Sequence, residues 1–339
     1  MGPRQAPRAA EPRLTAPAKR FVFAREERPG ADWTARFAAG RDEALAWYLG
    51  QGRAPAPGPA QCRAALQRHM PELLPLYDEA CALVGDDPLA HCLISHWRPA
   101  PAAGGCTQAV WLGTGGPALL RNYDFAPGAV SERFESTAWF GREVLCKAQR
   151  PWGGCLDGMN AEGLVASLTA GGGDALGEGF SILLVLRYLL ETCATVEQGI
   201  AALRRLPLAQ SQNVTLLDRR GAHATLFLGP GRAPGLSRLP ACANHQETPL
   251  EAHGSAARQA AVLAALAEPG MTLGALARRF LEPPLLSRDP GWLTVYGAVY
   301  RPAEGRVDYV WPGRRVRQAL GRFQPGDYRH DYATESTSP

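Results

Sequence analysis

The pattern of hydrophobic and polar residues changes near residue 106. Before that point, apolar positions between proline and glycine breaks predict helices over residues 32–50 and 60–84. The second helix should be interrupted at Pro71 or Pro75, because a proline inside a helix removes a hydrogen bond and clashes with the preceding turn. The first part of the chain is therefore expected to be mainly helical.

From residue 106 onward, short apolar runs bounded by turn residues predict β-strands with helices between them. We expect strands over residues 107–112, 117–123, 135–140, 142–148, 152–157, 163–169, 212–218, 222–228, 292–300 and 306–311. We expect helices over residues 180–193, 195–206, 254–268 and 272–281. Runs of strands, then helices, then strands again predict an α+β fold with antiparallel sheet.

Composition and charge are ordinary for a globular protein. Hydrophobic residues make up 46% of the 339 positions, and the net charge is +4. Much of the arginine excess lies near the two ends of the chain, so no nucleic-acid surface is expected. No apolar run reaches the roughly 18 residues that a membrane span needs, and no apolar signal segment follows the basic N-terminus. We therefore expect a cytoplasmic protein that binds no membrane.

The cysteines and histidines are not spaced like metal ligands. The eight cysteines include no Cys-x-x-Cys pair, and the seven histidines show no recognised ligand spacing. Free, mostly buried thiols and the absence of a metal or cofactor are therefore expected. Cys106 is the exception, because it follows two glycines at the point where the pattern changes.

Cys106 lies at the open end of the first predicted hairpin. Glycines beside Thr114 supply the turn, because glycine adopts positive φ without penalty. A turn centred between Thr114 and Gly115 places Cys106 opposite Tyr123. A shift of one residue in this register would turn the side chains to the other face of the sheet.

This register brings a thiol, a guanidinium and a carboxylate together, from Cys106, Arg121 and Asp124. If the chain is cut before Cys106, the new α-amine can serve as the base, since its pKa of roughly 7.7–8.0 suits proton transfer near neutral pH. Gly105 leaves the preceding bond open to attack because it has no side chain. Arg121 would favour the thiolate, and Asp124 would hold the amine. The pattern indicates a nucleophile at a self-cleavage site.

These residues resemble a known family. Gly105-Cys106-Thr107 and Arg121-Asn122-Tyr123-Asp124 are similar to motifs of the N-terminal-nucleophile cysteine hydrolases, which include bile-salt hydrolase and penicillin V acylase. The nearer resemblance is to the isopenicillin-N acyltransferase branch, the acyl-CoA:6-aminopenicillanic acid acyltransferase family of self-cleaving enzymes. Further segments resemble the family in the same order, at His69–Leu74, Asp157–Leu164, Ala243–His245 and Ser255–Arg258.

The resemblance implies a four-layer αββα sandwich, with two antiparallel sheets between two layers of helices. It makes Asn244 an oxyanion donor and gives Arg258 an ion-pair role at the site. Bile-salt hydrolases have a second asparagine where this chain has Thr169, so the resemblance leaves a substrate-binding role to Thr169 or to a backbone N–H. With the predicted elements, it divides the chain into a disordered basic tail, a helical pro-segment, a catalytic domain and a C-terminal tail, over residues 1–20, 21–105, 106–313 and 314–339.

We therefore expect a precursor that cuts itself between Gly105 and Cys106, with two chains that stay associated. The mature enzyme would hydrolyse the C–N bond of a small N-acyl compound or peptide through an acyl-thioester on Cys106. The resemblance also allows an acyltransferase that moves an acyl group from acyl-CoA or an amide to an amine, and no motif separates the two. Two other hypotheses are a binding protein of the same fold that does not cut itself, and a papain-like thiol hydrolase that uses His223 or His245.

Overall fold

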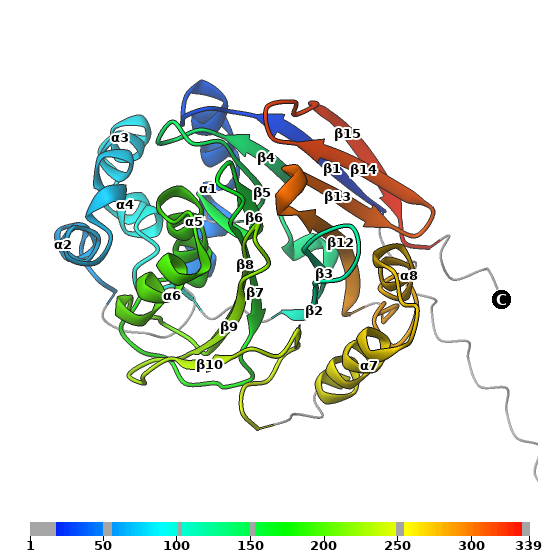
Figure 1. The fold of residues 1–339 in the computed structure, drawn as a ribbon. Helices are drawn as coiled ribbons and strands as arrows, with labels where there is room; N and C mark the ends of the chain where they lie inside the picture. The colour runs from blue at the N-terminus through cyan, green and yellow to red at the C-terminus, as the bar shows by residue number, and fades with distance from the viewer. Residues whose placement is uncertain are drawn as a thin grey trace, which may run out of the picture.

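Two β-sheets form the centre of the protein, and helices cover their outer sides (Figure 1). The structure is a computed structural model that describes residues 18–49, 56–100, 104–149, 153–248, 254–289 and 291–333. Most of the expected N-terminal tail lies outside these ranges, as do residues 101–103 of the expected pro-segment.

The larger sheet has nine strands in the order β10-β9-β8-β7-β6-β5-β4-β1-β15. Its strands are β1 (Ala18–Arg25), β4 (Arg133–Thr137), β5 (Val144–Gln149), β6 (Gly154–Asn160), β7 (Val165–Ala170), β8 (Gln212–Leu217), β9 (His223–Leu228), β10 (Gly235–Ser237) and β15 (Gly326–Asp331). Neighbours run antiparallel except β1 and β4, which are parallel. A strand from the start of the chain thus lies between β4 and a strand from its end.

The smaller sheet has six antiparallel strands in the order β11-β2-β3-β12-β13-β14. They are β2 (Gly105–Trp111), β3 (Ala118–Phe125), β11 (Ala241–Cys242), β12 (Leu293–Arg301), β13 (Arg306–Trp311) and β14 (Arg314–Ala319). The first predicted hairpin forms β2 and β3, and the last predicted hairpin forms β12 and β13.

The helices form the outer layers. On the side of the larger sheet lie α1 (Ala31–Leu49), α2 (Pro59–His69), α3 (Leu74–Val84), α4 (Pro88–Ile94), α5 (Ile182–Thr192) and α6 (Val196–Arg205). On the side of the smaller sheet lie α7 (Ser255–Ala267) and α8 (Leu273–Arg279). Short 3₁₀ turns occur at Pro71–Leu73, Pro127–Ala129 and Pro302–Glu304. The α+β prediction and the αββα sandwich are confirmed.

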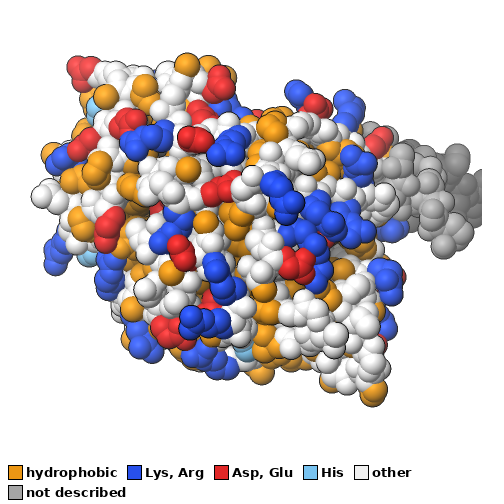
Figure 2. All heavy atoms as spheres, turned by 45° about the horizontal axis from the view of Figure 1, so that its top comes forward, with side chains coloured by type: hydrophobic (Ala, Val, Ile, Leu, Met, Phe, Trp, Pro, Cys, Tyr) orange, Lys and Arg blue, Asp and Glu red, His pale blue; other side chains and the backbone are white. Residues whose placement is uncertain are grey.

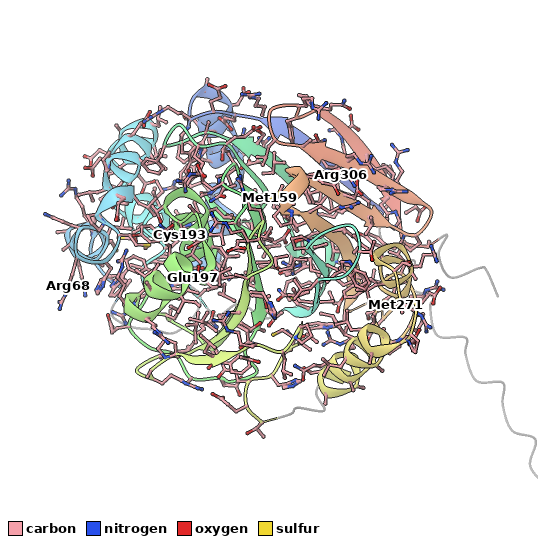
Figure 3. The ribbon with its side chains drawn as sticks, in the orientation of Figure 1. Arg68, Met159, Cys193, Glu197, Met271 and Arg306 are labelled. Carbon is pink, nitrogen blue, oxygen red and sulfur yellow. The ribbon has the colours of Figure 1, made fainter. Side chains whose placement is uncertain are left out.

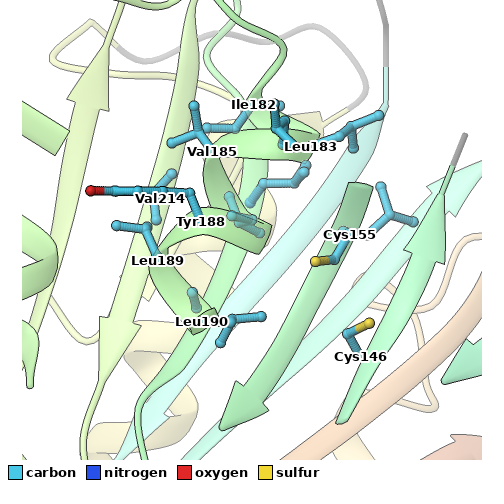
Figure 4. Packing of buried hydrophobic residues seen from close by; sticks show 14 of the residues in the cluster. Cys146, Cys155, Ile182, Leu183, Val185, Tyr188, Leu189, Leu190 and Val214 are labelled. Carbon is cyan, nitrogen blue, oxygen red and sulfur yellow. The ribbon is translucent and has the colours of Figure 1, made fainter. Parts of the chain in front are cut away.

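Apolar packing holds these layers together. Between the sheets, the rings of Phe134 and Tyr309 lie with their centroids 4.1 Å apart. On the outer side, α5 is apolar on nearly all faces and packs against the larger sheet, as Figure 4 shows for Leu189, Leu190 and Val214. A helix that is hydrophobic all round is expected to be buried.

Helix boundaries follow local chemistry. The predicted break falls at Pro71, which starts a 3₁₀ turn directly after α2. Pro88 is the first residue of α4, and the Asp87 carboxylate caps this helix by accepting the N–H of Ala90. Thr195 caps α6 in the same way, by accepting the N–H of Gln198. None of the helices in the described ranges is long and apolar enough to cross a membrane.

The expected tails are wrong where the structure describes them. Residues 314–319 and 326–331 form β14 and β15 instead of a C-terminal tail, and residues 18–20 belong to β1. The physical reason is pairing over long distances, since Phe21 pairs with Tyr328 and is fully buried. No local pattern shows such a partner in the sequence.

Candidate active site

The β2–β3 hairpin has the predicted register. Cys106 pairs with Tyr123, and Gly105 pairs with Asp124. This pairing places both sides of the bond between Gly105 and Cys106 inside a strand of the smaller sheet. Cys106 therefore lies in a fixed backbone, with its thiol fully buried between the sheets.

Arg121 contacts the thiol directly. Its guanidinium donates a hydrogen bond to Cys106 Sγ at 3.1 Å, and neither side chain is exposed. The same guanidinium donates to Asp157 Oδ2 at 2.6 Å and to the carbonyl oxygen of Leu156 at 3.0 Å. Arg121 is thus held from strand β6 while it contacts the nucleophile.

Asp157 is a site residue whose importance the sequence did not reveal. Its carboxylate is fully buried and accepts hydrogen bonds from the hydroxyls of Tyr296 and Tyr300, in addition to the ion pair with Arg121. In the sequence, Asp157 stands out only as the first residue of a segment that resembles the family. Both tyrosines lie on β12, far away in sequence, so no local spacing could have linked them to Asp157.

The thiol is neutral in the uncut chain. Burial raises the pKa of Cys106 to about 12, although the adjacent charge of Arg121 acts in the opposite direction. A thiol in this environment carries little of the reactive thiolate at neutral pH. Attack by Cys106 therefore requires that its proton be removed as the reaction proceeds.

Asn244 holds the backbone around the predicted cleavage site. Its Oδ1 accepts the N–H of Cys106 at 2.8 Å, and its Nδ2 donates to the carbonyl oxygen of Gly104 at 3.2 Å. The backbone N–H of Asn244 is in turn fixed by the hydroxyl of Ser255 at 2.7 Å. The carboxamide thus binds the chain one peptide unit before the cleavage site and at the cysteine nitrogen itself.

Arg258, in the first turn of α7, contacts the same segment. It donates hydrogen bonds to the carbonyl oxygen of Cys106, to the hydroxyl of Thr107 and, at 2.8 Å, to Asn244 Oδ1. Arg258 also lies 3.8 Å from the Asp124 carboxylate. The structure therefore joins two regions that the sequence singled out separately.

Asp124 lies opposite Gly105 and is 1% exposed, so its charge is almost completely shielded from water. It accepts a hydrogen bond from the hydroxyl of Thr294 at 2.7 Å. Burial raises the pKa of the Asp124 carboxyl, while the charge of Arg258 and the Thr294 hydroxyl lower it. The Asp124 carboxylate thus lies beside the strand that would begin with the α-amine of Cys106 after cleavage.

Gly105 is required by packing as well as by chemistry. A Cβ at this position would lie 2.3 Å from Nε1 of Trp292 and 3.0 Å from Cβ of Asp124. No side chain fits so close to a neighbouring ring. The indole therefore covers the bond that is expected to break.

Thr169 contacts the segment that leads into Asn244. Its hydroxyl donates to the carbonyl oxygen of Ala243 at 2.8 Å and accepts from Asn213 at 2.9 Å. Asn213, which the sequence did not single out, also donates to the carbonyl oxygen of His245 at 3.0 Å. These contacts fix the segment that carries Asn244.

The two histidines of the papain-like hypothesis do not contact the thiol within the described ranges. His245 interacts with the hydroxyl of Ser255 at 2.8 Å and with the side-chain oxygen of Gln259 at 2.7 Å. His223 lies in β9 and contacts the carbonyl oxygen of Arg238 at 3.1 Å. Among the described residues, no group of His, Cys, Asp and Glu is arranged to hold a metal ion.

A cavity of about 260 Å³ adjoins the site. Gly104 and Tyr123 line the part of it that lies next to the cleavage segment. Its apolar lining includes Trp47, Phe125, Leu156, Leu168, Ile182 and Leu183, and its polar lining includes Glu43, Gln149, Ser181, Gln210 and Gln212. Trp47 belongs to α1, so a helix before the cleavage site forms part of the wall.

Comparison with solved structures finds proteins of low sequence identity. A variant of conjugated bile acid hydrolase from Clostridium perfringens is 10% identical, with a TM-score of 0.48, over 67% of this chain and 98% of that chain. The Caenorhabditis elegans N-acylethanolamine-hydrolyzing acid amidase ortholog is 14% identical, with a TM-score of 0.47, over 66% and 99%. Penicillin V acylase from Agrobacterium tumefaciens is 15% identical, with a TM-score of 0.41, over 67% and 86%.

Comparison of the sequence gives a family. No curated protein matches the chain as a relative. A family model described as "AAT: Acyl-coenzyme A:6-aminopenicillanic acid acyl-transferase" matches residues 111–261, a range that begins after Cys106 and includes Arg121, Asn244 and Arg258. The resemblance seen in the motifs is thereby confirmed: over residues 111–261, this chain is similar to the acyl-coenzyme A:6-aminopenicillanic acid acyl-transferase family.

Proposed function

We propose that this protein is a self-cleaving amidohydrolase with an N-terminal cysteine nucleophile. The observation that carries the proposal is the arrangement around one residue. Arg121 donates to the Cys106 thiol, Asn244 accepts its N–H, and Arg258 donates to its carbonyl oxygen. The Cys106 thiol and the Cys106 nitrogen are therefore both held in place. Self-cleavage breaks the peptide bond at this nitrogen, and substrate turnover then uses the same nitrogen as a free amine.

Self-cleavage is the first proposed step. Cys106 Sγ attacks the carbonyl carbon of Gly105, the C–N bond breaks, and the thiol proton passes to the released nitrogen. The product is a thioester between Gly105 and Cys106, together with a free α-amine. Water then opens the thioester, which leaves a carboxylate on Gly105 and the thiol on Cys106.

Substrate turnover follows the same chemistry with the α-amine as base. The amine nitrogen of Cys106 begins 2.8 Å from Asn244 Oδ1, so this contact can orient it after cleavage. The thiolate attacks the acyl carbon of an amide, and the amine carries the proton to the leaving nitrogen. Once Gly104 departs, Asn244 Nδ2 is free to donate to the oxyanion. Water completes the cycle by releasing the acyl group as a carboxylate.

The cavity beside Gly104 suggests an apolar acyl group. Its volume of about 260 Å³ exceeds the ~150 Å³ of an engineered apolar cavity that binds benzene, so an acyl group of roughly six to ten carbons would fit. Trp47, Phe125 and Leu168 provide apolar surface for such a group, and Glu43 is the charged residue of the lining within the described ranges. We propose an N-acyl compound or peptide with such a group as substrate.

We also propose that the two products of cleavage stay together. Strand β1 lies before the cleavage site and pairs with β4 and β15, which follow it. Its residues Phe21 and Phe23 are buried in the core between the sheets. Separation would expose this core and break two ladders of backbone hydrogen bonds, so the chains should remain associated.

A cytoplasmic location is part of the proposal. All eight cysteines are free thiols, which suits a reducing compartment. Fractionation of cells that make a tagged protein would test the location. Recovery of the processed protein outside the cytoplasmic fraction would contradict it.

Acyl transfer is the second candidate function, and the family match over residues 111–261 favours it. In that case an amine, not water, would resolve the acyl-thioester, and acyl-CoA could supply the acyl group. A binding protein that keeps the fold without cutting itself is the third. It would leave the bond before Cys106 intact in the purified protein.

Intact mass under denaturing conditions tests the proposal. We expect two fragments from the wild-type protein, meeting between Gly105 and Cys106, and a single chain from Cys106→Ala. A single uncut chain from both proteins would refute self-cleavage and favour the binding protein. Turnover of acyl-CoA with an amine, without turnover of any amide, would replace the hydrolase by the transferase.

A further inference from the structure

A groove on the outer side of the smaller sheet is separate from the candidate active site. It lies between α8 and strands β12, β13 and β14, and it encloses about 550 Å³. Its apolar lining includes Leu273, Ala277, Leu281, Val299 and Val310. The labels of Met271, before α8, and Arg306, at the start of β13, help to locate this region in Figure 3.

The smaller sheet separates this groove from the thiol of Cys106. Successive side chains of a strand point to opposite faces of the sheet. In β12, Tyr300 reaches Asp157 in the interior, whereas its neighbour Val299 lines the groove. In the same way, Val310 of β13 faces the groove. A ligand in the groove would therefore not reach the nucleophile, and the groove is not part of the substrate cavity.

The rim of the groove is strongly positive. Its lining includes Arg278 from α8, Arg301 from the end of β12, and Arg314 and Arg315 from β14. Within the described ranges, Asp308 is the one carboxylate of this lining, and the Arg314 guanidinium turns to the other face of the sheet, so three positive charges against one negative charge leave an excess of two. Figure 2 shows Lys and Arg side chains gathered on the face that carries the last strands. Like charges this close repel one another unless an anion lies among them.

Arg278 and Arg315 face the groove without a close acidic partner. Arg278 is exposed and forms no ion pair within the described ranges. Arg315 pairs in the sheet with Val310, which lines the groove, and lies 3.8 Å from Asp308, which is already paired with Arg317 at 2.8 Å. By contrast, Arg301 pairs with Glu304, and the guanidinium of Arg314 turns to the interior face and lies over the ring of Tyr328. One of the two available guanidinium groups thus comes from a helix and the other from a strand.

We propose that this groove binds an organic phosphate that carries an apolar group. The guanidinium fork matches phosphate oxygens two at a time, and several such forks around one hollow select a multiply charged oxyanion. The apolar lining would take up an alkyl chain or a ring attached to the phosphate. A purely inorganic anion would leave this lining exposed to water, so the shared chemistry is a phosphate with an apolar substituent.

Calorimetric titration with octyl phosphate tests the proposal. Inorganic phosphate and octanol serve as comparison ligands, since each lacks one half of the proposed chemistry. We expect octyl phosphate to bind at least about tenfold more tightly than either, with an affinity that falls as salt is added. Titration of Cys106→Ala as well as the wild-type protein makes the result independent of self-cleavage.

The chain offers a matched control for the arginines. The double variant Arg278→Gln, Arg315→Gln should weaken octyl phosphate binding by about tenfold or more. The double variant Arg279→Gln, Arg314→Gln removes the same charge from the same helix and strand. Arg279 pairs with Glu268 outside the groove, and the guanidinium of Arg314 lies over Tyr328 on the other face of the sheet, so this variant should weaken binding by less than about twofold.

The outcomes decide between a site and a general basic face. Equal losses in the two double variants would overturn the proposal, as would octyl phosphate that binds no better than octanol. Sedimentation with phosphatidylglycerol vesicles identifies the source of the phosphate. Sedimentation that the Arg278→Gln, Arg315→Gln variant loses supports the site with a lipid headgroup as its natural ligand. Binding of octyl phosphate without sedimentation supports the site with a soluble phosphate ester.

Discussion

Removal of the Asp157 charge is the sharpest perturbation of the site. Asp157→Asn keeps the size of the side chain but removes the carboxylate that pairs with Arg121 at 2.6 Å. It also turns an amide N–H₂ toward a site where Tyr296 and Tyr300 both donate. All four side chains are essentially excluded from water, so the guanidinium charge would lose its partner in the interior.

The expected cost follows from this burial. Removing one partner of a buried ion pair destabilises a protein by about 3–5 kcal/mol, because the other charge stays buried without compensation. At about 1.4 kcal/mol per power of ten, the folding equilibrium should fall by roughly two to three and a half powers of ten. The change should be measured in a Cys106→Ala background, where self-cleavage cannot alter the result.

Urea unfolding followed by tryptophan fluorescence gives the free energy of unfolding. Asp78→Asn is the matched control, because Asp78 pairs with Arg63 at 2.7 Å with both side chains 44–47% exposed. An exposed pair contributes about 0–1 kcal/mol, so this control should change little. Similar losses in both variants would refute the reasoning that burial makes the Arg121–Asp157 pair critical.

A second readout separates positioning of the thiol from stability alone. The charge of Asp157 contributes to the raised pKa of Cys106, and the charge of Arg121 opposes it. This readout uses protein that retains Cys106. If Asp157→Asn leaves Arg121 in place, the thiol pKa should fall, and alkylation of Cys106 should reach its plateau at lower pH. A pKa that rises would mean that the guanidinium has left the thiol. An unchanged pKa would contradict the coupling of these three residues.

Three further predictions concern the cleavage segment. Asn244→Ala should slow self-cleavage by about 10²-fold, measured by intact mass over time, because its carboxamide positions Gly104 and Cys106 around the scissile bond; cleavage at the wild-type rate would remove Asn244 from self-cleavage. Gly105→Ala should destabilise the uncut chain by about 1–3 kcal/mol in thermal unfolding because its Cβ meets Trp292, and Trp292→Leu should restore most of the loss; no loss in the single variant would contradict the packing argument. Because the pKa of Cys106 is raised to about 12, its thiolate fraction and the rate of self-cleavage should both increase from about pH 6 to about pH 9, and a flat profile would count against thiolate attack.

Local patterns were sufficient for much of the fold. The glycine turn around Thr114 fixed the register that places Cys106 opposite Tyr123, because a short turn leaves few alternatives. The apolar run of α5 and the cap at Thr195 also gave nearly correct helix ends. In each of these elements, the residues that decide the structure lie within a few positions of one another.

Elements that depend on distant partners were missed. Strand β14, with the sequence Arg-Arg-Val-Arg-Gln-Ala, has an exposed edge and buries mainly Gln318, so it resembles a polar tail. Strand β1 is held in the sheet by antiparallel pairing with β15, which lies more than 300 residues further along the chain. The same limit hid Asp157, whose hydroxyl donors come from the other sheet. The chemistry of a side chain can be predicted from the sequence, whereas contacts between strands that are far apart in the sequence cannot.

The uncut segment itself explains why self-cleavage and turnover should share residues. Asn244 binds Gly104 on one side of the scissile peptide and Cys106 on the other, so the precursor occupies the contacts that a substrate would use. The cavity lined by Gly104 then lies where the acyl part of a substrate must extend from the thiol. A change at Asn244 should therefore impair both reactions, whereas a change at Trp47, in the cavity wall, should alter the preferred acyl group and leave self-cleavage at its normal rate.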